Sequence, residues 1–214
     1  MSLKVNEIFY SIQGESTYAG YPCVLIRLSG CNLRCSFCDT RYAYTEGVSM
    51  EISEILETVA GYGCPLVEIT GGEPLLQEET PALILSLLEK SYRVLMETNG
   101  SMDISRVDPR CVRIIDVKCP SSGESHRNDL QNLNRLTGGD EIKFVIADRT
   151  DYEYAKMILL RNQRIEEIAV PVHFSPAFGG ISLETLASWI LEDRLPVRVH
   201  VQLHKIIWPG ESGR

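Results

Sequence analysis

The sequence lacks the features that mark membrane proteins, secreted proteins and nucleic-acid-binding proteins. No apolar run approaches the roughly 20 residues that a membrane span requires. Residues 1–10 (MSLKVNEIFY) have neither the apolar core nor the small-residue cleavage site of a secretory leader. Clusters of Lys and Arg are missing too, and the net charge is -8, so we expect no electrostatic footprint for nucleic acid. These absences predict a cytoplasmic protein, free of membrane and nucleic acid, that acts on a small molecule.

Disulfides and a second domain are not expected either. The chain has seven cysteines, an odd number that cannot pair fully, and a reducing compartment disfavours disulfides. No composition break, low-complexity segment or internal repeat divides the sequence. A hydrophobic fraction of 44% and a charged fraction of 23% are typical of a globular protein. We therefore expect a single domain over residues 1–214.

Short apolar runs alternate with segments of helical periodicity along most of the chain. The runs that predict buried strands are residues 23–30, 66–72, 93–100, 113–120, 141–148, 168–176 and 198–205. The segments that predict helices are residues 51–63, 79–92, 126–136, 151–162 and 183–193. This alternation indicates βαβ units around a parallel sheet, either doubly wound or a full or partial barrel.

The positions of the polar signals favour an α/β barrel with a single active face. Polar, Gly-rich or Cys-rich residues directly follow nearly all of the predicted strands. Parallel α/β folds place their chemistry at that edge of the sheet. Residues 5–16 (VNEIFYSIQGES) stand outside the alternation and predict a strand followed by a turn. We expect this N-terminal extension, about residues 1–20, to close one end of the sheet.

Three cysteines are clustered in GCNLRCSFCDT, residues 30–40. Cys31, Cys35 and Cys38 have the spacing CxxxCxxC, and no fourth cysteine or histidine lies nearby in sequence. A structural zinc site normally requires four ligands. Three thiolates suit a 4Fe-4S cluster that leaves one iron open to another ligand. From spacing alone, a zinc-binding module or plain buried thiols remain the alternatives, whereas Cys64, Cys111 and Cys119 are simplest as buried apolar side chains.

The motif CNLRCSFCDT, with Phe37 before its last cysteine, resembles the signature of the radical S-adenosylmethionine (SAM) superfamily. TGGEP, residues 70–74, resembles the motif of that superfamily that contacts the methionyl group of SAM, although alone it would also fit a tight strand-to-helix turn. The resemblance implies a single-domain partial (β/α) barrel in which SAM is cleaved to a 5′-deoxyadenosyl radical. It implies SAM contacts from Phe37, Cys38, Asp39, Gly71, Gly72, Glu73, Ser121 and Ser122. Glycine permits close backbone approach, and Glu73 can accept a hydrogen bond from an ammonium group.

Four further stretches resemble one member of the superfamily, the 7-carboxy-7-deazaguanine synthase family. They are FYSIQGES, CDT, METNG and QLHKIIWPG, which together span the chain. The resemblance implies a lyase that contracts the ring of 6-carboxy-5,6,7,8-tetrahydropterin to 7-carboxy-7-deazaguanine with loss of ammonia, in queuosine or other 7-deazapurine biosynthesis. It also implies a homodimer and an electron donor such as flavodoxin.

The resemblance assigns substrate-binding and magnesium-binding residues as well. The pterin would contact Ile12, Gln13, Gly14, Glu15 and Arg27, and Mg²⁺ would bind Thr40. From their positions we also expect substrate contacts from Thr70, one residue before the glycines, and from His204, if its strand face lines the barrel lumen. Arg27 lies inside an apolar run, so its guanidinium needs an anion, from the protein or from a ligand. Simpler alternatives are a plain turn at Gly14, a capping role for Thr40 and a structural His204. The sequence indicates no general base.

Two other functions compete with this assignment. A glycyl-radical-enzyme activating protein shares the cluster motif and a similar length, but it has no need for the pairing of IQGE with QLHK. A zinc-binding interaction module would lack iron altogether. Iron content and visible absorbance of protein purified without oxygen separate the second alternative from the cluster hypothesis.

Overall fold

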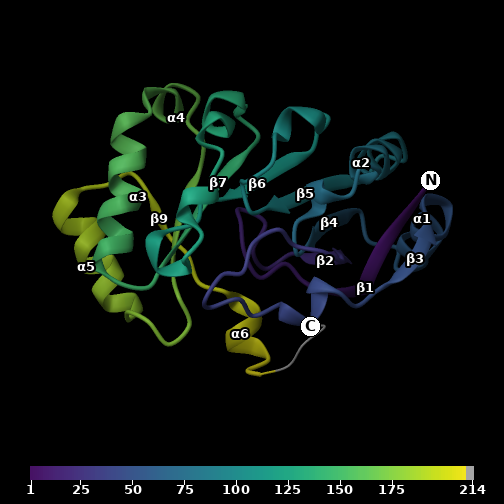
Figure 1. Ribbon diagram of the computed structural model, residues 1–214, viewed down its shortest axis with the longest axis horizontal. Coiled ribbons are helices and arrows are strands. Elements are labelled where there is room, and N and C mark those ends of the chain that lie inside the picture. The colour runs from purple at the N-terminus through teal and green to yellow at the C-terminus, as the bar shows by residue number, and fades with distance from the viewer. Residues whose placement is uncertain (211–214) are drawn as a thin grey trace.

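The computed structural model describes residues 1–210, in which one curved sheet of nine strands runs through the molecule (Figure 1). The strands are β1 (Ser2–Ile12), β2 (Pro22–Leu28), β3 (Val48–Glu51), β4 (Leu66–Gly71), β5 (Arg93–Thr98), β6 (Val112–Asp116), β7 (Glu141–Ile146), β8 (Val172–Pro176) and β9 (Arg198–Val199). Their order is β3-β1-β2-β4-β5-β6-β7-β8-β9. All pairs from β2 to β9 are parallel, whereas β1 pairs antiparallel with β2 and with β3.

This strand order identifies the fold as a partial barrel. From β2 onward the strands follow the chain in one direction, without the reversal that defines a doubly wound sheet. The sheet ends at β3 on one side and at β9 on the other, so it stays open. Six of the seven parallel strands, β2 and β4 to β8, coincide with six of the seven apolar runs of the sequence, and the predicted partial (β/α) barrel is confirmed.

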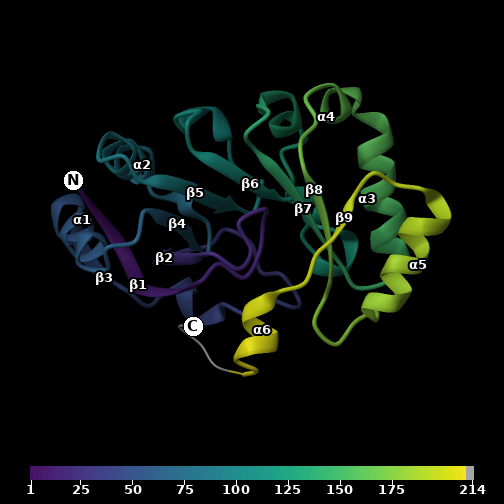
Figure 2. The ribbon, with the colours of Figure 1, turned by 180° about the vertical axis from the view of Figure 1, so that it is seen from behind.

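Five helices cover the outer side of the sheet, namely α1 (Ile52–Gly61), α2 (Thr80–Glu89), α3 (Arg149–Arg161), α4 (Gln163–Glu167) and α5 (Leu183–Asp193). Helix α6 (Leu203–Ile207) instead contributes to the wall of the central cavity. Asp148 and Ser182 cap α3 and α5 by accepting hydrogen bonds from backbone N–H groups of the first turn. In both views α6 lies across from α2 and α4, beside the segment that follows β2 (Figures 1 and 2). None of the helices in residues 1–210 is long and apolar enough to cross a membrane.

Alternate residues of the parallel strands divide between the core and a central cavity. In β2 the side chains of Val24 and Ile26 are fully buried in the core, whereas Arg27 lines the cavity. In β4 the corresponding core residue is Ile69, and Thr70 lines the cavity. Because successive side chains of a strand point to opposite faces, the inner face of the sheet presents every second residue to the cavity.

Two predicted elements are wrong. Residues 198–205 were expected to form a strand, but β9 ends at Val199 and α6 begins at Leu203. Residues 126–136 were expected to form a helix, but they form 3₁₀ turns over Ser125–Arg127 and Leu130–Arg135. In the second case Asn132 bonds to backbone groups of residues 100, 102 and 104. These tertiary contacts hold Asn132 against the turn after β5, and tertiary contacts can override helical propensity.

The first 20 residues contribute to the sheet itself, whereas the sequence suggested a cover over one end. β1 pairs with β2 over most of its length, and its other edge pairs with β3, which the sequence analysis did not identify. Leu3 and Val5 of β1 are buried in the core. Only the segment after β1, residues 13–21, turns across the mouth of the cavity, where Gln13 and Gly14 form part of its wall.

Candidate active site

A cavity of about 680 Å³ opens at the carboxyl ends of the parallel strands. This volume lies within the range of roughly 300–1,000 Å³ that is usual for small-molecule sites. Most of the residues that the sequence suggested for binding line this one cavity. They are Ile12, Gln13, Gly14, Glu15, Arg27, Cys31, Cys35, Phe37, Cys38, Asp39, Thr40, Thr70, Gly71, Gly72 and His204. Glu73, Ser121 and Ser122 do not belong to its wall in the described residues.

The loop after β2 carries the three clustered cysteines. Cys31, Cys35 and Cys38 are partly buried and all face the cavity. Burial raises the pKa values of Cys31 and Cys35, so these groups are thiols until a metal displaces their protons. The remaining cysteines are buried free thiols elsewhere in the chain.

The donor set fits an iron-sulfur cluster better than a structural zinc ion. In residues 1–210 no three His, Cys, Asp or Glu side chains converge on a point where one metal ion could bind. A closed zinc site needs four such ligands at short range. Three thiols on one loop that lines the cavity could instead hold an iron-sulfur cluster that leaves one iron open to another ligand. Cys31, Cys35 and Cys38 are thus the residues that would hold the cluster.

Ser121 and Ser122 fasten the cysteine loop through their backbone. The carbonyl oxygen of Ser122 accepts a hydrogen bond from the Ser36 N–H at 3.0 Å, and that of Ser121 accepts from the Ser36 hydroxyl at 2.7 Å. The Ser122 hydroxyl donates to the Cys119 carbonyl, and the Ser121 hydroxyl donates to Asp148. These side chains are therefore already engaged, and their contact with SAM stays a prediction.

The two glycines of TGGEP let the turn after β4 pack against the cysteine loop. Gly71 has a φ of +145°, and a Cβ there would collide with the backbone of Leu28. A Cβ at Gly72 would collide with the Gly30 carbonyl and with the Cys31 side chain. Both glycines also line the cavity. Their small size therefore serves the approach of two loops of the protein, in addition to leaving room for a ligand.

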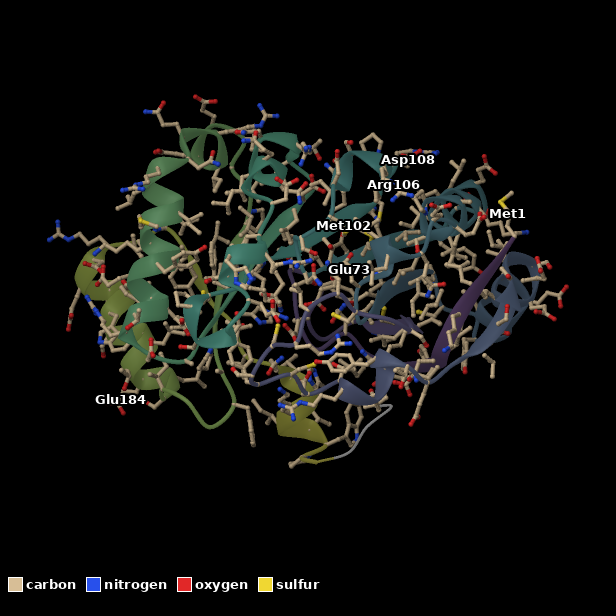
Figure 3. All side chains as sticks on the ribbon, viewed as in Figure 1. Met1, Glu73, Met102, Arg106, Asp108 and Glu184 are labelled. Carbon is tan, nitrogen blue, oxygen red and sulfur yellow. The ribbon has the colours of Figure 1, made fainter. Side chains whose placement is uncertain are left out.

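Glu73 anchors the turns that follow β4 and β5. Its side chain is 0% exposed and lies in the interior of the molecule (Figure 3). The carboxylate accepts hydrogen bonds from the N–H groups of Leu75 and Asn99 at 3.0 and 2.7 Å and from the Thr98 hydroxyl at 2.9 Å. Burial nevertheless raises its pKa. The expected contact between Glu73 and an ammonium group of SAM stays a prediction.

Glu15 is held at the other end of the cavity by two partners far away in the sequence. Its carboxylate pairs with the Lys143 ammonium group and accepts a hydrogen bond from the Gln202 amide at 2.6 Å. Burial alone would raise its pKa, but Lys143 and Gln202 together lower the pKa of Glu15 to about 2. The Gln13 side chain accepts a hydrogen bond from the Glu15 N–H at 2.9 Å. The loop therefore presents fixed polar groups to the cavity.

The segment from β9 to α6 completes this end of the site. The Leu203 N–H donates to the Gly14 carbonyl at 2.9 Å, and His200 Nε2 lies 3.3 Å from the Ser16 carbonyl. A Cβ on Gly14 would collide with the ring of His204, which lines the cavity. Burial lowers the pKa of His204 and favours the neutral ring. The predicted pairing of IQGE with QLHK is therefore present, although it uses a helix where a strand was expected.

Arg27 and Thr70 are neighbours on adjacent parallel strands. The anion that the sequence required for Arg27 is Glu7, which accepts a hydrogen bond from Arg27 Nε at 2.7 Å. Tyr42 donates to the same carboxylate at 3.0 Å. Among residues 1–210 no hydrogen bond uses the terminal Nη atoms of Arg27. The guanidinium group is therefore free to bind a carboxylate through a bidentate pair of hydrogen bonds.

Thr40 and Asp39 lie side by side on the cavity wall. The Thr40 hydroxyl donates to Asp39 at 2.9 Å, and Lys205 of α6 pairs with the same Asp39 at 2.7 Å. Burial raises the pKa of Asp39, but Lys205 and Thr40 outweigh it and lower the pKa to about 2. Thr40 precedes the 3₁₀ turn Arg41–Tyr44 without capping it through its side chain. Its hydroxyl oxygen therefore remains open to Mg²⁺, which binds few protein oxygens and keeps several waters.

Sequence reasoning missed a group of charged residues on the floor of the cavity. Lys118 pairs with Asp116 at 2.7 Å, Lys143 pairs with Glu97 at 2.7 Å, and Glu68 lies among them. Four of these residues lie in strands, namely Glu68, Glu97, Asp116 and Lys143. Each of them interrupts an apolar run at a position that faces the cavity. The argument applied to Arg27, that a charge within a buried strand needs a partner, would have found all of them.

Comparisons with known proteins agree with this geometry. The Radical SAM superfamily matches residues 25–115. The 7-carboxy-7-deazaguanine synthase of Chlorobaculum tepidum is 44% identical and covers 98% of this chain and 96% of the relative. The enzyme of the same name from Koribacter versatilis is also 44% identical, over 98% of this chain and 99% of the relative. A crystal structure of QueE from Escherichia coli shares the fold, with a TM-score of 0.75, 22% identity and 95% coverage of both chains. The chain belongs to the 7-carboxy-7-deazaguanine synthase family of the radical SAM superfamily.

Proposed function

We propose that the protein converts 6-carboxy-5,6,7,8-tetrahydropterin to 7-carboxy-7-deazaguanine and ammonia. The substrate and the two products balance, because the purine analogue differs from the pterin by the elements of one ammonia molecule. The observation that carries the proposal is that one cavity is lined by two different sets of groups. The first set is the three thiols of the loop after β2, and the second set is Gln13, Glu15 and Arg27.

The second set of groups matches the polar edges of a carboxylated pterin. The pyrimidine-like ring carries an amide next to amino-substituted nitrogens, so it needs both donors and acceptors. Gln13 and Glu15 supply these, and the pair of Glu15 with Lys143 keeps the carboxylate ionised. The free Nη atoms of Arg27 suit the substrate carboxylate. Binding at both ends would fix the orientation of the ring in the cavity.

The cluster and SAM, when bound, would supply the radical that removes a hydrogen atom from carbon 6 of the substrate. Cys31, Cys35 and Cys38 would hold the cluster, and the turn at Gly71 and Gly72 would place SAM against it. Residues 13–15 and helix α6 border the cavity and would shield the reacting ring from water. Thr40 would hold Mg²⁺, which can order the oxygens of the substrate.

Anaerobic turnover tests this proposal directly. Cluster-loaded protein is given SAM, Mg²⁺, a reductant and 6-carboxytetrahydropterin, and the product is identified by mass spectrometry. Formation of 7-carboxy-7-deazaguanine with one equivalent of ammonia is expected. A sample with a reducible cluster that forms no deazaguanine would refute the substrate assignment.

The cellular setting of the proposed reaction is also part of the proposal. We expect a cytoplasmic enzyme that receives its electron from a donor such as flavodoxin and that forms a homodimer. Sedimentation analysis and reduction by purified flavodoxin test these two expectations. Activation of a glycyl-radical enzyme is less compatible with a cavity of about 680 Å³ that is bordered by residues 12–15 and α6, because a peptide substrate needs an open groove.

A further inference from the structure

Glu68 of β4 is a buried acid whose side chain has no hydrogen-bond partner among residues 1–210. The residue is 4% exposed and lines the cavity floor. Its Oε2 atom is buried and makes no hydrogen bond to any part of the chain that the structure describes. Leu25 and Leu95 flank it on the neighbouring strands. Because buried polar groups are nearly always hydrogen-bonded, an unpartnered carboxyl group that faces a cavity points to a ligand.

The charges around Glu68 leave it without a counter-ion. Glu97 of β5 and Glu15 of the loop after β1 repel its carboxylate form, whereas Lys143 of β7 and Arg27 of β2 attract it. Lys143 pairs with Glu15 and Glu97, and Arg27 pairs through Nε with Glu7, so in residues 1–210 neither cation forms an ion pair with Glu68. Burial is the largest influence and, with Glu97 and Glu15, raises the pKa of Glu68 well above its ordinary value. Glu68 therefore keeps its proton over a pH range in which an ordinary Glu has lost it.

A neutral carboxylic acid presents a donor beside an acceptor. Its O–H group can donate while its C=O group accepts. In a tetrahydropterin the ring nitrogen N1 is an acceptor that lies between two donors, the 2-amino group and the N8–H group. We propose that Glu68 is a substrate-binding residue whose neutral acid donates to N1 of the pterin and accepts from one of the adjacent N–H groups. This inference rests on the proposed function, and it gives the pyrimidine-like ring a second contact besides the loop of Gln13 and Glu15.

Two variants at Glu68 test the inference. Glu68→Gln keeps an acceptor beside a donor, whereas Glu68→Leu removes both and places an apolar side chain beside Leu25 and Leu95. The dissociation constant of 6-carboxytetrahydropterin is measured on cluster-loaded enzyme with SAM and Mg²⁺ but without reductant, so that no turnover occurs. We expect binding within about threefold of wild type for Glu68→Gln and weaker by ~10–100-fold for Glu68→Leu, since two hydrogen bonds are lost. Glu57→Gln, on the exposed face of α1, is the matched control and should bind like wild type.

The pH profile supplies a readout that a purely structural role would not change. Wild-type affinity should fall as pH rises and Glu68 loses its proton, whereas the affinity of Glu68→Gln should not show this loss. A shared loss in both proteins would point to Glu97, whose pKa burial also raises, and would overturn the role of Glu68. If Glu68→Leu fails to fold, the profile of Glu68→Gln decides the matter.

Two further outcomes would overturn the inference. Equal weakening in Glu68→Gln and Glu68→Leu would mean that the substrate requires an ionised carboxylate. Unchanged binding in Glu68→Leu would mean that Glu68 does not contact the substrate. In both cases product formation by the wild type shows that the proposed function stands. Absence of product from the wild type would instead reject the proposed function.

Discussion

Lys143 is the shared counter-ion of two buried carboxylates at the cavity, those of Glu15 and Glu97. Its side chain is 7% exposed and pairs with Glu15, with Glu97 at 2.7 Å and more distantly with Asp116 at 4.0 Å. Lys143→Met preserves much of the volume but leaves buried carboxylates without their counter-ion. Removal of one partner of a buried ion pair destabilises a protein by ~3–5 kcal/mol. We expect a loss of this size in the free energy of unfolding at pH 7.5, measured by urea denaturation with circular dichroism.

A matched control is available on the outside of the molecule. Lys156 is 24% exposed in its side chain and pairs with Asp193 at 2.8 Å. Lys156→Met should cost at most ~1 kcal/mol, because water screens a partly exposed pair. Equal losses in Lys143→Met and Lys156→Met would refute the reasoning, since burial of the first pair would then have no energetic consequence.

The pH dependence of the Lys143→Met variant has a defined sign. In the wild type the pKa of Glu15 is lowered from 4.5 to about 2. Its contribution to stability is therefore present above pH 4.5 and is lost as the pH falls toward 2. The difference in unfolding free energy between wild type and variant should be largest above pH 4.5 and should shrink below it. A difference that grows on acidification would contradict the role of Glu15.

Three other changes give separate tests. Cys35→Ala removes one of the three thiolate ligands and should abolish the visible absorbance of the reconstituted cluster, whereas Cys64→Ala should leave the iron content unchanged. Equal iron content in the two variants would contradict the assignment. Gly14→Ala should weaken substrate binding and cost ~1–3 kcal/mol of stability, because the new methyl group collides with His204; a variant with unchanged thermal midpoint and affinity would show that the loop adapts freely. Thr40→Val should remove the dependence of turnover on Mg²⁺ while it preserves cluster loading, and titration of Mg²⁺ into reduced enzyme checks this.

The parts of the fold and site that sequence could predict are those that depend on local pattern. The spacing of Cys31, Cys35 and Cys38 lies within eight residues, and the structure places all three on one cavity wall. Six of the seven parallel strands are mostly apolar runs, so their positions can be read from the sequence pattern. TGGEP likewise marks a turn in which Gly71 and Gly72 must lack side chains.

The parts that could not be predicted depend on contacts between distant residues. His204 was placed in a strand because VQLHKI alternates, yet α6 begins at Leu203, whose N–H bonds to Gly14. The side chain of Glu73 looked available for a ligand, but Leu75, Thr98 and Asn99 occupy its carboxylate. Local sequence patterns do not indicate which distant residue a buried polar side chain will bond to.

The joining of residues 13–16 to residues 200–204 also determines when the site can form during synthesis. Gln202 and Glu15 are 187 positions apart, and His200 and Ser16 are 184 apart. A ribosome must therefore release nearly the whole chain before this end of the cavity exists. The cysteine loop and β2 emerge early, but their fastening through Ser121 and Ser122 needs about half of the chain. Vectorial synthesis thus completes the contacts of the cysteine loop before those that join residues 13–16 to residues 200–204.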